Sequence, residues 1–511
     1  MALACYLIAL TASSFADAGA RPGANAFWRR SLRAKLLHVS VVTLLFCIAL
    51  VASVRPAFSA FVVFACVAGL VIIGNAKYEA LREPLVFTDL SLFSQLFRHP
   101  RLYLPFLSAG EVVAILLGAG VFATAFLIDP PLTHLHYAWL ACVIAVALGA
   151  CVVLPPRLPL TLDAALDQVM HGFVAVFVAY FLNGMRTRTF RALQEALDTS
   201  GFARTGAPAH RPDILVIQSE SFFDARRLDS SIRTSILEQF DRARAEAWLH
   251  GELDVPAWGA NTMRSEFALL TGLDQSKLGY ARFYPYAFVR RACASLASWF
   301  KGSGYRTLAI HPYHANFFGR DRAFRHFGFE HFVDIDAFAS ARRAGAYVAD
   351  EAVADKVIDT LEASTDPVFI FAVTMENHGP LHLEPVEPGE GAAYHALGDA
   401  PELHDLTAYL RHLVNADAMI GRLLTYLRTR ERDTVVCFYG DHVPAMSRAY
   451  RHIGRLPHRS DFFIWTNYSA TSPRSSKLRI DELGRALIGA MDSERTTRRT
   501  PEPQFAPAEM N

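Results

Sequence analysis

A series of apolar segments opens the chain and constrains its fold more than any other feature. The segments lie near residues 36–54, 57–74, 109–128, 137–154 and 169–183. Each approaches the roughly 20 apolar residues that cross a bilayer as a helix. Hydrophobic residues make up 52% of the 511-residue chain, which is high for a soluble enzyme. We therefore predict a polytopic α-helical membrane domain over residues 1–184, with about five transmembrane helices.

Basic residues beside the predicted spans indicate their orientation. Two flanks are predicted to be cytoplasmic because they carry basic residues. The flank before the first span contains Arg29, Arg30, Arg33 and Lys35. The link between the second and third spans contains Lys77, Arg82, Arg98 and Arg101. The link "DPPLTHLHY" contains no Lys or Arg and is predicted to lie outside. Five crossings then place the rest of the chain outside the cytoplasm, which we take as the periplasmic side of an inner membrane. The apolar stub Met1–Leu10 leaves the span count open by one, and Arg186, Arg188 and Arg191 form a basic cluster on the outer side.

The remainder is predicted to contain a linker over 185–210, a catalytic domain over 211–491 and a disordered tail over 492–511. Only Cys293 and Cys437 of the seven cysteines fall in this part, so no disulfide framework is expected. The formal net charge of +1 gives no indication of nucleic-acid binding.

Short β-rich runs alternate with longer helical patterns after residue 211, which predicts an α/β fold with a mostly parallel sheet. Four of the apolar runs end at acidic or imidazole side chains: Glu220, His311, His378, and the pair Asp441 and His442. Ligands of open α/β sheets bind at the carboxyl ends of the strands. These side chains are therefore predicted to form one site, although any one of them alone could be a turn former or a helix cap.

A further site residue is predicted in "WGANTMRSEFALLTG", where Thr262 lies at the start of a short helix. A helix N-terminus favours a phosphate, but Thr262 could also be a plain N-cap. Two carboxylates, an imidazole and a hydroxyl suit Mn²⁺, Mg²⁺ or Zn²⁺, and such an ion would make the hydroxyl a nucleophile. Arg320 could bind phosphate or form an ion pair with Asp321 or another acid.

Five motifs in order, "ESFFD", "NTMRSEF", "HPYHANFFGRDRAFRHFGF", "ENHGP" and "YGDH", resemble the lipoteichoic acid synthase family of the sulfatase and alkaline phosphatase superfamily. The resemblance implies Glu220, Thr262, Asp441 and His442 as ligands of one divalent ion, most plausibly Mn²⁺. It implies Thr262 as the nucleophile. It also implies His311, Arg320 and His378 around a bound glycerophosphate, with Phe318 where the synthases have tryptophan.

The implied activity is transfer of glycerophosphate from phosphatidylglycerol to a hydroxyl of an envelope glycan or polymer. Phosphoethanolamine transferases share the five-span plan and the threonine nucleophile, but resemble "GET" and "SDHGES" where this chain has "SES" and "GDHVP". A sulfatase is disfavoured because Thr262 is not followed by the proline of the formylglycine motif. A third hypothesis is a membrane scaffold with an inactive outer domain.

Overall fold

The computed structural model describes residues 1–90, 109–134, 136–204, 206, 208, 210–469 and 472–492. The predicted flanking residues Arg98 and Arg101, and the tail beyond 492, lie outside these ranges. The chain divides into two compact units. The helical unit contains residues 1–196 together with 258–264 and 274–289, and the α/β unit contains the rest. Two short segments from the predicted catalytic domain thus belong to the helical unit.

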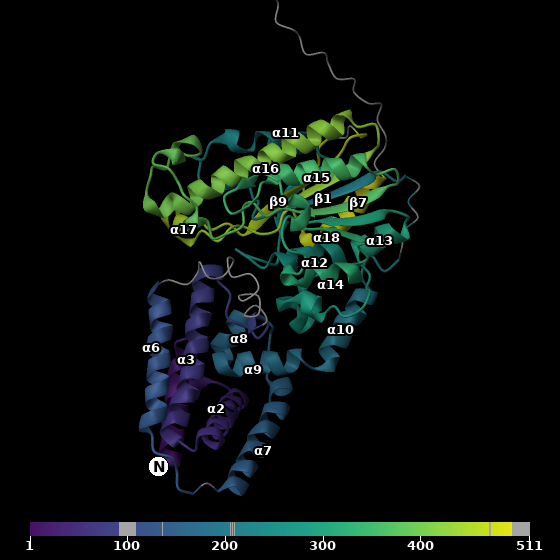
Figure 1. Cartoon of the computed structure of the whole chain (residues 1–511). Helices are drawn as coiled ribbons and strands as arrows, with labels where there is room; N and C mark the ends of the chain where they lie inside the picture. Colours follow the sequence, from purple (N-terminus) through teal and green to yellow (C-terminus); the bar gives the residue numbers. More distant parts are fainter. Residues whose placement is uncertain are drawn as a thin grey trace, which may run out of the picture. The chain divides into compact units, whose positions relative to one another are not determined.

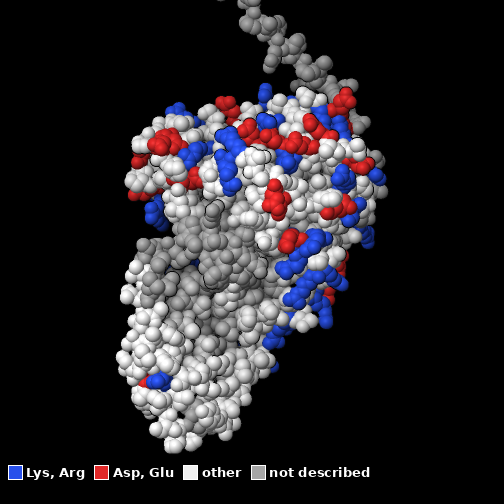
Figure 2. All heavy atoms as spheres, in the orientation of Figure 1, with Lys and Arg blue, Asp and Glu red and all other residues white. Residues whose placement is uncertain are grey.

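The helical unit is built mostly from apolar helices, with the more polar α10 (Thr187–Asp198) at its end. They are α1 (Ala2–Ala18), α2 (Leu32–Ser53), α3 (Pro56–Leu81), α6 (Ala109–Ile128), α7 (Tyr137–Val153), α8 (Ala164–His171), α9 (Phe173–Gly184) and α10 (Thr187–Asp198) (Figure 1). Among the described helices, three are long and apolar enough to cross a membrane: 32–53, 56–81 and 137–157. Large apolar side chains of α6 and α7, such as Leu117 and Trp139, point outward. Charged side chains are sparse on this unit in Figure 2, as in a membrane protein.

The fifth predicted span, 169–183, is broken at Gly172, which separates α8 from α9. Helix α9 has 12 residues and is therefore about 18 Å long, shorter than the hydrocarbon core of a bilayer. Asp17 of α1 pairs with Arg30 at this break, and its carboxylate accepts a hydrogen bond from the Val174 backbone at 2.6 Å. The first ten residues, left open by the sequence, belong to the 17-residue apolar helix α1.

Replacing Gly172 by alanine should destabilise the helical unit. Gly172 has φ +87°, and an added Cβ would meet the Arg30 guanidinium and the Asp17 carboxylate. The strained backbone alone costs about 1–3 kcal/mol. We expect Gly172→Ala to lower the melting temperature in detergent, whereas Gly149→Ala on α7, where nothing lies within 4 Å of the new Cβ, should not. Equal melting temperatures for the two variants would contradict this packing.

The two ends of the helical unit are distinguished by their contacts. At one end, the Leu132 backbone donates to the Val54 carbonyl at 2.9 Å, which joins the α2–α3 and α6–α7 links. At the other end, Arg82 lies over the ring of Trp258, a residue of the predicted outer domain. The end of α3 therefore lies beside a segment that the sequence places after the last predicted span.

Two of the basic residues in the predicted cytoplasmic flanks are locally paired. Lys77 donates to Asp89 at 2.7 Å, and Arg30 is buried against Asp17.

Among the described residues of the α/β unit, one sheet has eight strands in the order β10-β2-β9-β8-β1-β7-β3-β4. The strands are β1 (Asp213–Ser219), β2 (Leu249–Asp254), β3 (Arg306–Ile310), β4 (His331–Val333), β7 (Val368–Val373), β8 (Thr434–Gly440), β9 (Arg459–Thr466) and β10 (Leu478–Arg479). Strands β8, β1, β7, β3 and β4 are parallel, and β9 is antiparallel to β8 and β2. A separate hairpin contains β5 (Arg343–Ala344) and β6 (Tyr347–Val348). The predicted α/β fold is confirmed.

Helices cover both faces of this sheet (Figure 1). One face carries α11 (Glu238–Glu246), α15 (Asp350–Glu362) and α16 (His404–Thr429). The other carries α12 (Thr262–Thr271), α13 (Leu296–Gly302) and α18 (Ile480–Met491); α14 (Arg320–Phe327) and α17 (Ser447–Ile453) complete the unit. The apolar stripe of α16, from Leu406 to Leu427, is buried, as its helical spacing predicts.

Candidate active site

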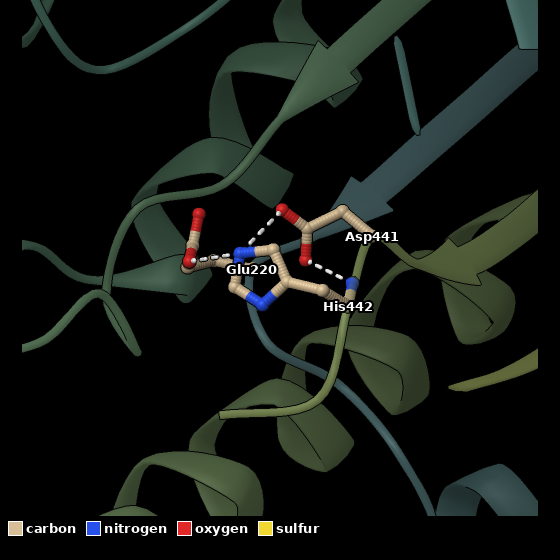
Figure 3. Close-up of side chains that lie close together, drawn as sticks. All are labelled: Glu220, Asp441 and His442. Atoms are coloured by element: carbon tan, nitrogen blue, oxygen red, sulfur yellow. Dashed lines mark hydrogen bonds and ion pairs between the residues drawn. The ribbon is translucent and has the colours of Figure 1, made fainter. Parts of the chain in front are cut away.

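Three of the predicted metal ligands lie together at the carboxyl edge of the sheet. Glu220 follows β1, and Asp441 and His442 follow β8. Their ligand atoms lie within 4.8 Å of one another, and all three side chains are buried. Nε2 of His442 is 3.5 Å from Glu220 Oε1 and 3.4 Å from Asp441 Oδ2 (Figure 3). The imidazole therefore faces both carboxylates, as the ligands of one small cation do.

Backbone N–H groups orient this cluster. Ser221 has φ +56°, and its N–H donates to Asp441 Oδ1 at 2.8 Å. The N–H of His442 donates to the same oxygen at 2.9 Å, so Oδ2 is the oxygen near the imidazole. The Ser221 hydroxyl donates to Glu220 Oε1 at 3.1 Å. Sequence reasoning missed Ser221, because a serine after a strand carries no distinctive signal.

The electrostatics of the cluster fit a divalent cation. Burial raises the pKa of Glu220 well above its ordinary value, and the negative charge of Asp441 raises this pKa further. Two buried carboxylates this close ionise together only at a high energetic cost unless a positive charge lies between them. A divalent ion supplies that charge, and two carboxylates with one imidazole are a donor set that Mn²⁺, Mg²⁺ and Zn²⁺ accept.

Thr262 is the first residue of α12 and is buried. The residue before it, Asn261, has φ +70°, which turns the chain into the helix. One turn later, the Ser265 hydroxyl donates to the backbone carbonyl of Asp441 at 2.6 Å. Residues 258–264 group with the helical unit, whereas the helix from Ser265 onward belongs to the α/β unit.

Arg320 forms a second buried cluster at the same edge of the sheet. Its Nε donates to Glu266 Oε2 at 2.9 Å, and its Nη2 also pairs with this carboxylate. Both side chains are buried. Of the two roles left open for Arg320, the structure shows the ion pair, and the acid is Glu266 of α12 rather than Asp321. Phe318 packs against the guanidinium, which lies 5.3 Å from its ring centroid.

His311 is held by Arg320 as well. Nη1 of Arg320 lies 3.1 Å from Nε2 of His311. Because a guanidinium only donates, Nε2 must accept, and the proton of the neutral ring lies on Nδ1, which is 3.4 Å from the Val373 carbonyl. Burial lowers the pKa of His311 well below its usual value, and the charge of Arg320 lowers it further. In this arrangement the neutral His311 accepts from Arg320 and helps to orient the guanidinium.

His378 follows β7 and lies against the β5–β6 hairpin. Its Nδ1 is 2.7 Å from the Gly379 carbonyl, and the Tyr347 hydroxyl is 3.3 Å from the same nitrogen. Burial lowers the pKa of His378 to about 4. The ring is therefore neutral at pH 7, and with Nδ1–H donating to Gly379, Nε2 carries a lone pair that can accept a proton. Tyr347, 31 residues before His378, was not found from the sequence.

The fold and this site define a membrane protein with an α/β domain of the alkaline phosphatase type. Residues 212–493, more than half of the chain, match the family model described as Sulfatase. The chain belongs to the sulfatase family. This confirms the superfamily to which the sequence motifs pointed.

Several known proteins are similar to this chain. The capsular polysaccharide biosynthesis protein RkpI of Rhizobium meliloti is 28% identical, over 96% of this chain and 94% of that protein. A putative cyclic beta-1,2-glucan modification protein of the same organism is 28% identical, over 52% of this chain and 43% of that protein. The lipooligosaccharide phosphoethanolamine transferase EptA from Neisseria meningitidis has the same fold over 94% of this chain and 95% of its own, with 12% identity and a TM-score of 0.54.

The solved structure of the phosphoglycerol transferase GacH from Streptococcus pyogenes, in complex with sn-glycerol-1-phosphate, is also similar, with 22% identity and a TM-score of 0.47 over 60% of this chain and 80% of that chain.

Proposed function

We propose that this protein is a membrane-bound transferase that moves glycerophosphate from phosphatidylglycerol to a hydroxyl of an envelope glycan or polymer, through a phosphothreonine at Thr262. The observation that carries the proposal is the buried cluster of Glu220, Asp441 and His442. The helix that begins at Thr262 is tied to this cluster through Ser265. The motifs of the sequence match this arrangement in order.

Glu220, Asp441 and His442, with the hydroxyl of Thr262, would hold one divalent ion, with Mn²⁺ as our first choice. When bound, the ion would lower the pKa of the Thr262 hydroxyl and offset negative charge on the phosphoryl group. These roles also account for two buried carboxylates at adjacent strand ends, which a stable sheet does not need.

The chain's own groups would act in two steps. In the first, Oγ of Thr262 bonds to phosphorus while the bond to the diacylglycerol oxygen breaks, and diacylglycerol leaves as the alcohol with the proton that the Thr262 hydroxyl releases. In the second, an acceptor hydroxyl attacks this phosphothreonine diester, and Nε2 of His378 takes the proton of that hydroxyl. The bond to Thr262 Oγ then breaks, and the threonine is regenerated with the proton from His378.

The resemblance of the sequence motifs, and not the charge near the cluster, favours phosphatidylglycerol as the donor. Arg320 interacts electrostatically with both Glu220 and His378, but its charge is paired with the buried Glu266 carboxylate and does not select between the two headgroups. Phe318 beside Arg320 adds an apolar surface that suits the glycerol carbons.

The relatives support a glycan as the acceptor. One is named for capsular polysaccharide biosynthesis and another for modification of a cyclic glucan. We propose that this chain uses a polysaccharide hydroxyl in the same general way, on the periplasmic side of the inner membrane.

The contacts at the two ends of the helical unit support five crossings, formed by α1, α2, α3, α6 and α7. The Ala2–Ala18 helix replaces the predicted span over 169–183. The N-terminus and the Asp129–His136 link would then face the cytoplasm, and the α3–α6 link the periplasm. A reporter that is active only in the periplasm should be active when fused after Glu83 and inactive when fused after Pro130. The reverse pattern would contradict this topology.

The direct test is the intact mass of the full-length protein in vesicles of phosphatidylglycerol with Mn²⁺. A gain of one glycerophosphate on Thr262 would support the nucleophile and the donor together. Parallel vesicles of phosphatidylethanolamine test the other headgroup. An adduct with the mass of phosphoethanolamine would identify phosphatidylethanolamine as the donor and rule out phosphatidylglycerol. The full chain is needed because residues 258–264 group with the helical unit. Absence of any adduct, with no transfer to glycan, would favour the inactive scaffold.

A further inference from the structure

The link after α3, "REPLVFTDL" (Arg82–Leu90), is a segment that the proposed chemistry does not use. It is nevertheless well ordered by its own contacts. Asp89 accepts hydrogen bonds from the Val86 backbone and from Lys77, both at 2.7 Å. Leu85 and Phe87 are buried within the helical unit. The contacts of Asp89, Leu85 and Phe87 therefore fix the segment that carries the second acidic residue, Glu83.

Glu83 contacts the turn that leads to Thr262. Its Oε1 accepts a hydrogen bond from Nη1 of Arg264 at 2.6 Å, and its Oε2 accepts one from Nδ2 of Asn261 at 3.3 Å. Arg264 is buried at the ion pair. One carboxylate thus holds the residue before Thr262 and the second residue after it.

Two further contacts hold the same turn. Arg82 lies over the ring of Trp258, 5.4 Å from its centroid. Nε of Arg264 donates to the Phe283 carbonyl at 3.3 Å, and the Phe283 ring packs on Tyr180 of α9. Glu83 keeps its charge here: burial works to raise its pKa, but Arg264 and Lys77 outweigh burial and lower this pKa.

Asn261 needs this support because it has φ +70°, a conformation that costs free energy for a residue other than glycine. The direction of the first turn of α12, and with it the position of the Thr262 hydroxyl, depends on this residue. Position matters for a nucleophile, since a displacement of about 1 Å can reduce the rate by about 100-fold.

We propose that Glu83 is a positioning residue that holds the Asn261–Arg264 turn and thereby orients the Thr262 hydroxyl for phosphoryl transfer. The inference rests on the proposed function in taking Thr262 as the nucleophile. It gives the helical unit a part in the reaction beyond anchoring the enzyme near its lipid donor.

The test compares Glu83→Gln with Glu79→Gln in the full-length protein. Glu79 lies on the same helix end, but its ion pair with Arg21 is exposed. We expect Glu83→Gln to slow formation of the Thr262 adduct by about 10- to 100-fold, while Mn²⁺ still binds through Glu220, Asp441 and His442. Glu79→Gln should match the unmodified protein. The charge-reversed pair Glu83→Arg with Arg264→Glu should recover part of the lost rate, which a general loss of folding would not allow.

Hydrogen exchange provides a readout that does not depend on activity. The backbone amides of residues 261–268 should exchange faster in Glu83→Gln than in Glu79→Gln, with residues 214–219 of β1 unchanged in both. Unchanged exchange at 261–268, or an unchanged adduct rate in Glu83→Gln, would overturn the positioning role. If the unmodified protein forms no adduct at all, the transfer mechanism fails, while the exchange experiment still reports whether Glu83 holds the turn.

Discussion

Replacing Thr262 by alanine should abolish headgroup transfer, with a loss on the order of 10³-fold or more, as expected when the nucleophile of a covalent mechanism is removed. The substitution deletes a hydroxyl and a methyl at the first residue of α12, which is not in the hydrophobic core, so folding and membrane insertion should persist. The measurement is transfer of labelled glycerophosphate from phosphatidylglycerol vesicles, together with the intact mass of the protein.

Two neighbouring substitutions sharpen this test. Thr262→Ser keeps a hydroxyl at the same carbon and should retain part of the activity and the adduct. Ser265→Ala removes the hydrogen bond to the Asp441 carbonyl but no proposed reacting atom, so it should reduce the rate without eliminating the adduct. Full transfer by Thr262→Ala would rule out Thr262 as the nucleophile.

Replacing Asp441 by asparagine should remove metal binding and activity together and, without metal, should stabilise the protein. The amide can still accept the N–H groups of Ser221 and His442 through its oxygen, but its NH₂ group would then be directed toward the cation. Removing the charge of Asp441 also removes a cause of the raised pKa of Glu220. At neutral pH, the metal-free variant therefore has less charge repulsion to overcome when it folds.

Melting temperatures with EDTA and with Mn²⁺ separate the two effects. A metal at 100 times its dissociation constant should stabilise the unmodified protein by about 2.7 kcal/mol. The asparagine variant should melt higher than the unmodified protein in EDTA and gain almost nothing from Mn²⁺. An equal gain from Mn²⁺ in both proteins would show that Asp441 is not a ligand. Asp433→Asn, at the other end of β8 and paired with His210, is a control that should bind Mn²⁺ normally.

The site could be predicted where it depends on strand ends. Apolar runs ending at Glu220, His311, His378 and Asp441 are visible in the sequence, and the rule for parallel sheets places such ends at one edge. The structure confirms the premise, since β8, β1, β7 and β3 are consecutive neighbours. The roles of these residues in metal and substrate binding stay predictions.

Other parts of the site could not be found in this way because they depend on partners that are distant in sequence. Glu266, the acid of Arg320, lies 54 residues earlier on a different helix. Arg320 in turn contacts His311, whose Nε2 accepts a hydrogen bond from it. A residue type shows which hydrogen bonds are available, but the packing decides which of them are made.

The sequence alone determined that this is a membrane protein followed by a mostly parallel α/β domain, because the length of apolar runs and their period follow from local backbone geometry. Only the tertiary structure decided which segments of the chain form the helical unit and where its helices begin and end. Gly172 interrupts one apolar segment at the place where Asp17 and Arg30 pack. Lys77 forms an ion pair with Asp89, and Arg82 lies over the ring of Trp258. Charge pairing and close packing are properties of residues brought together from distant positions, and hydropathy does not record them.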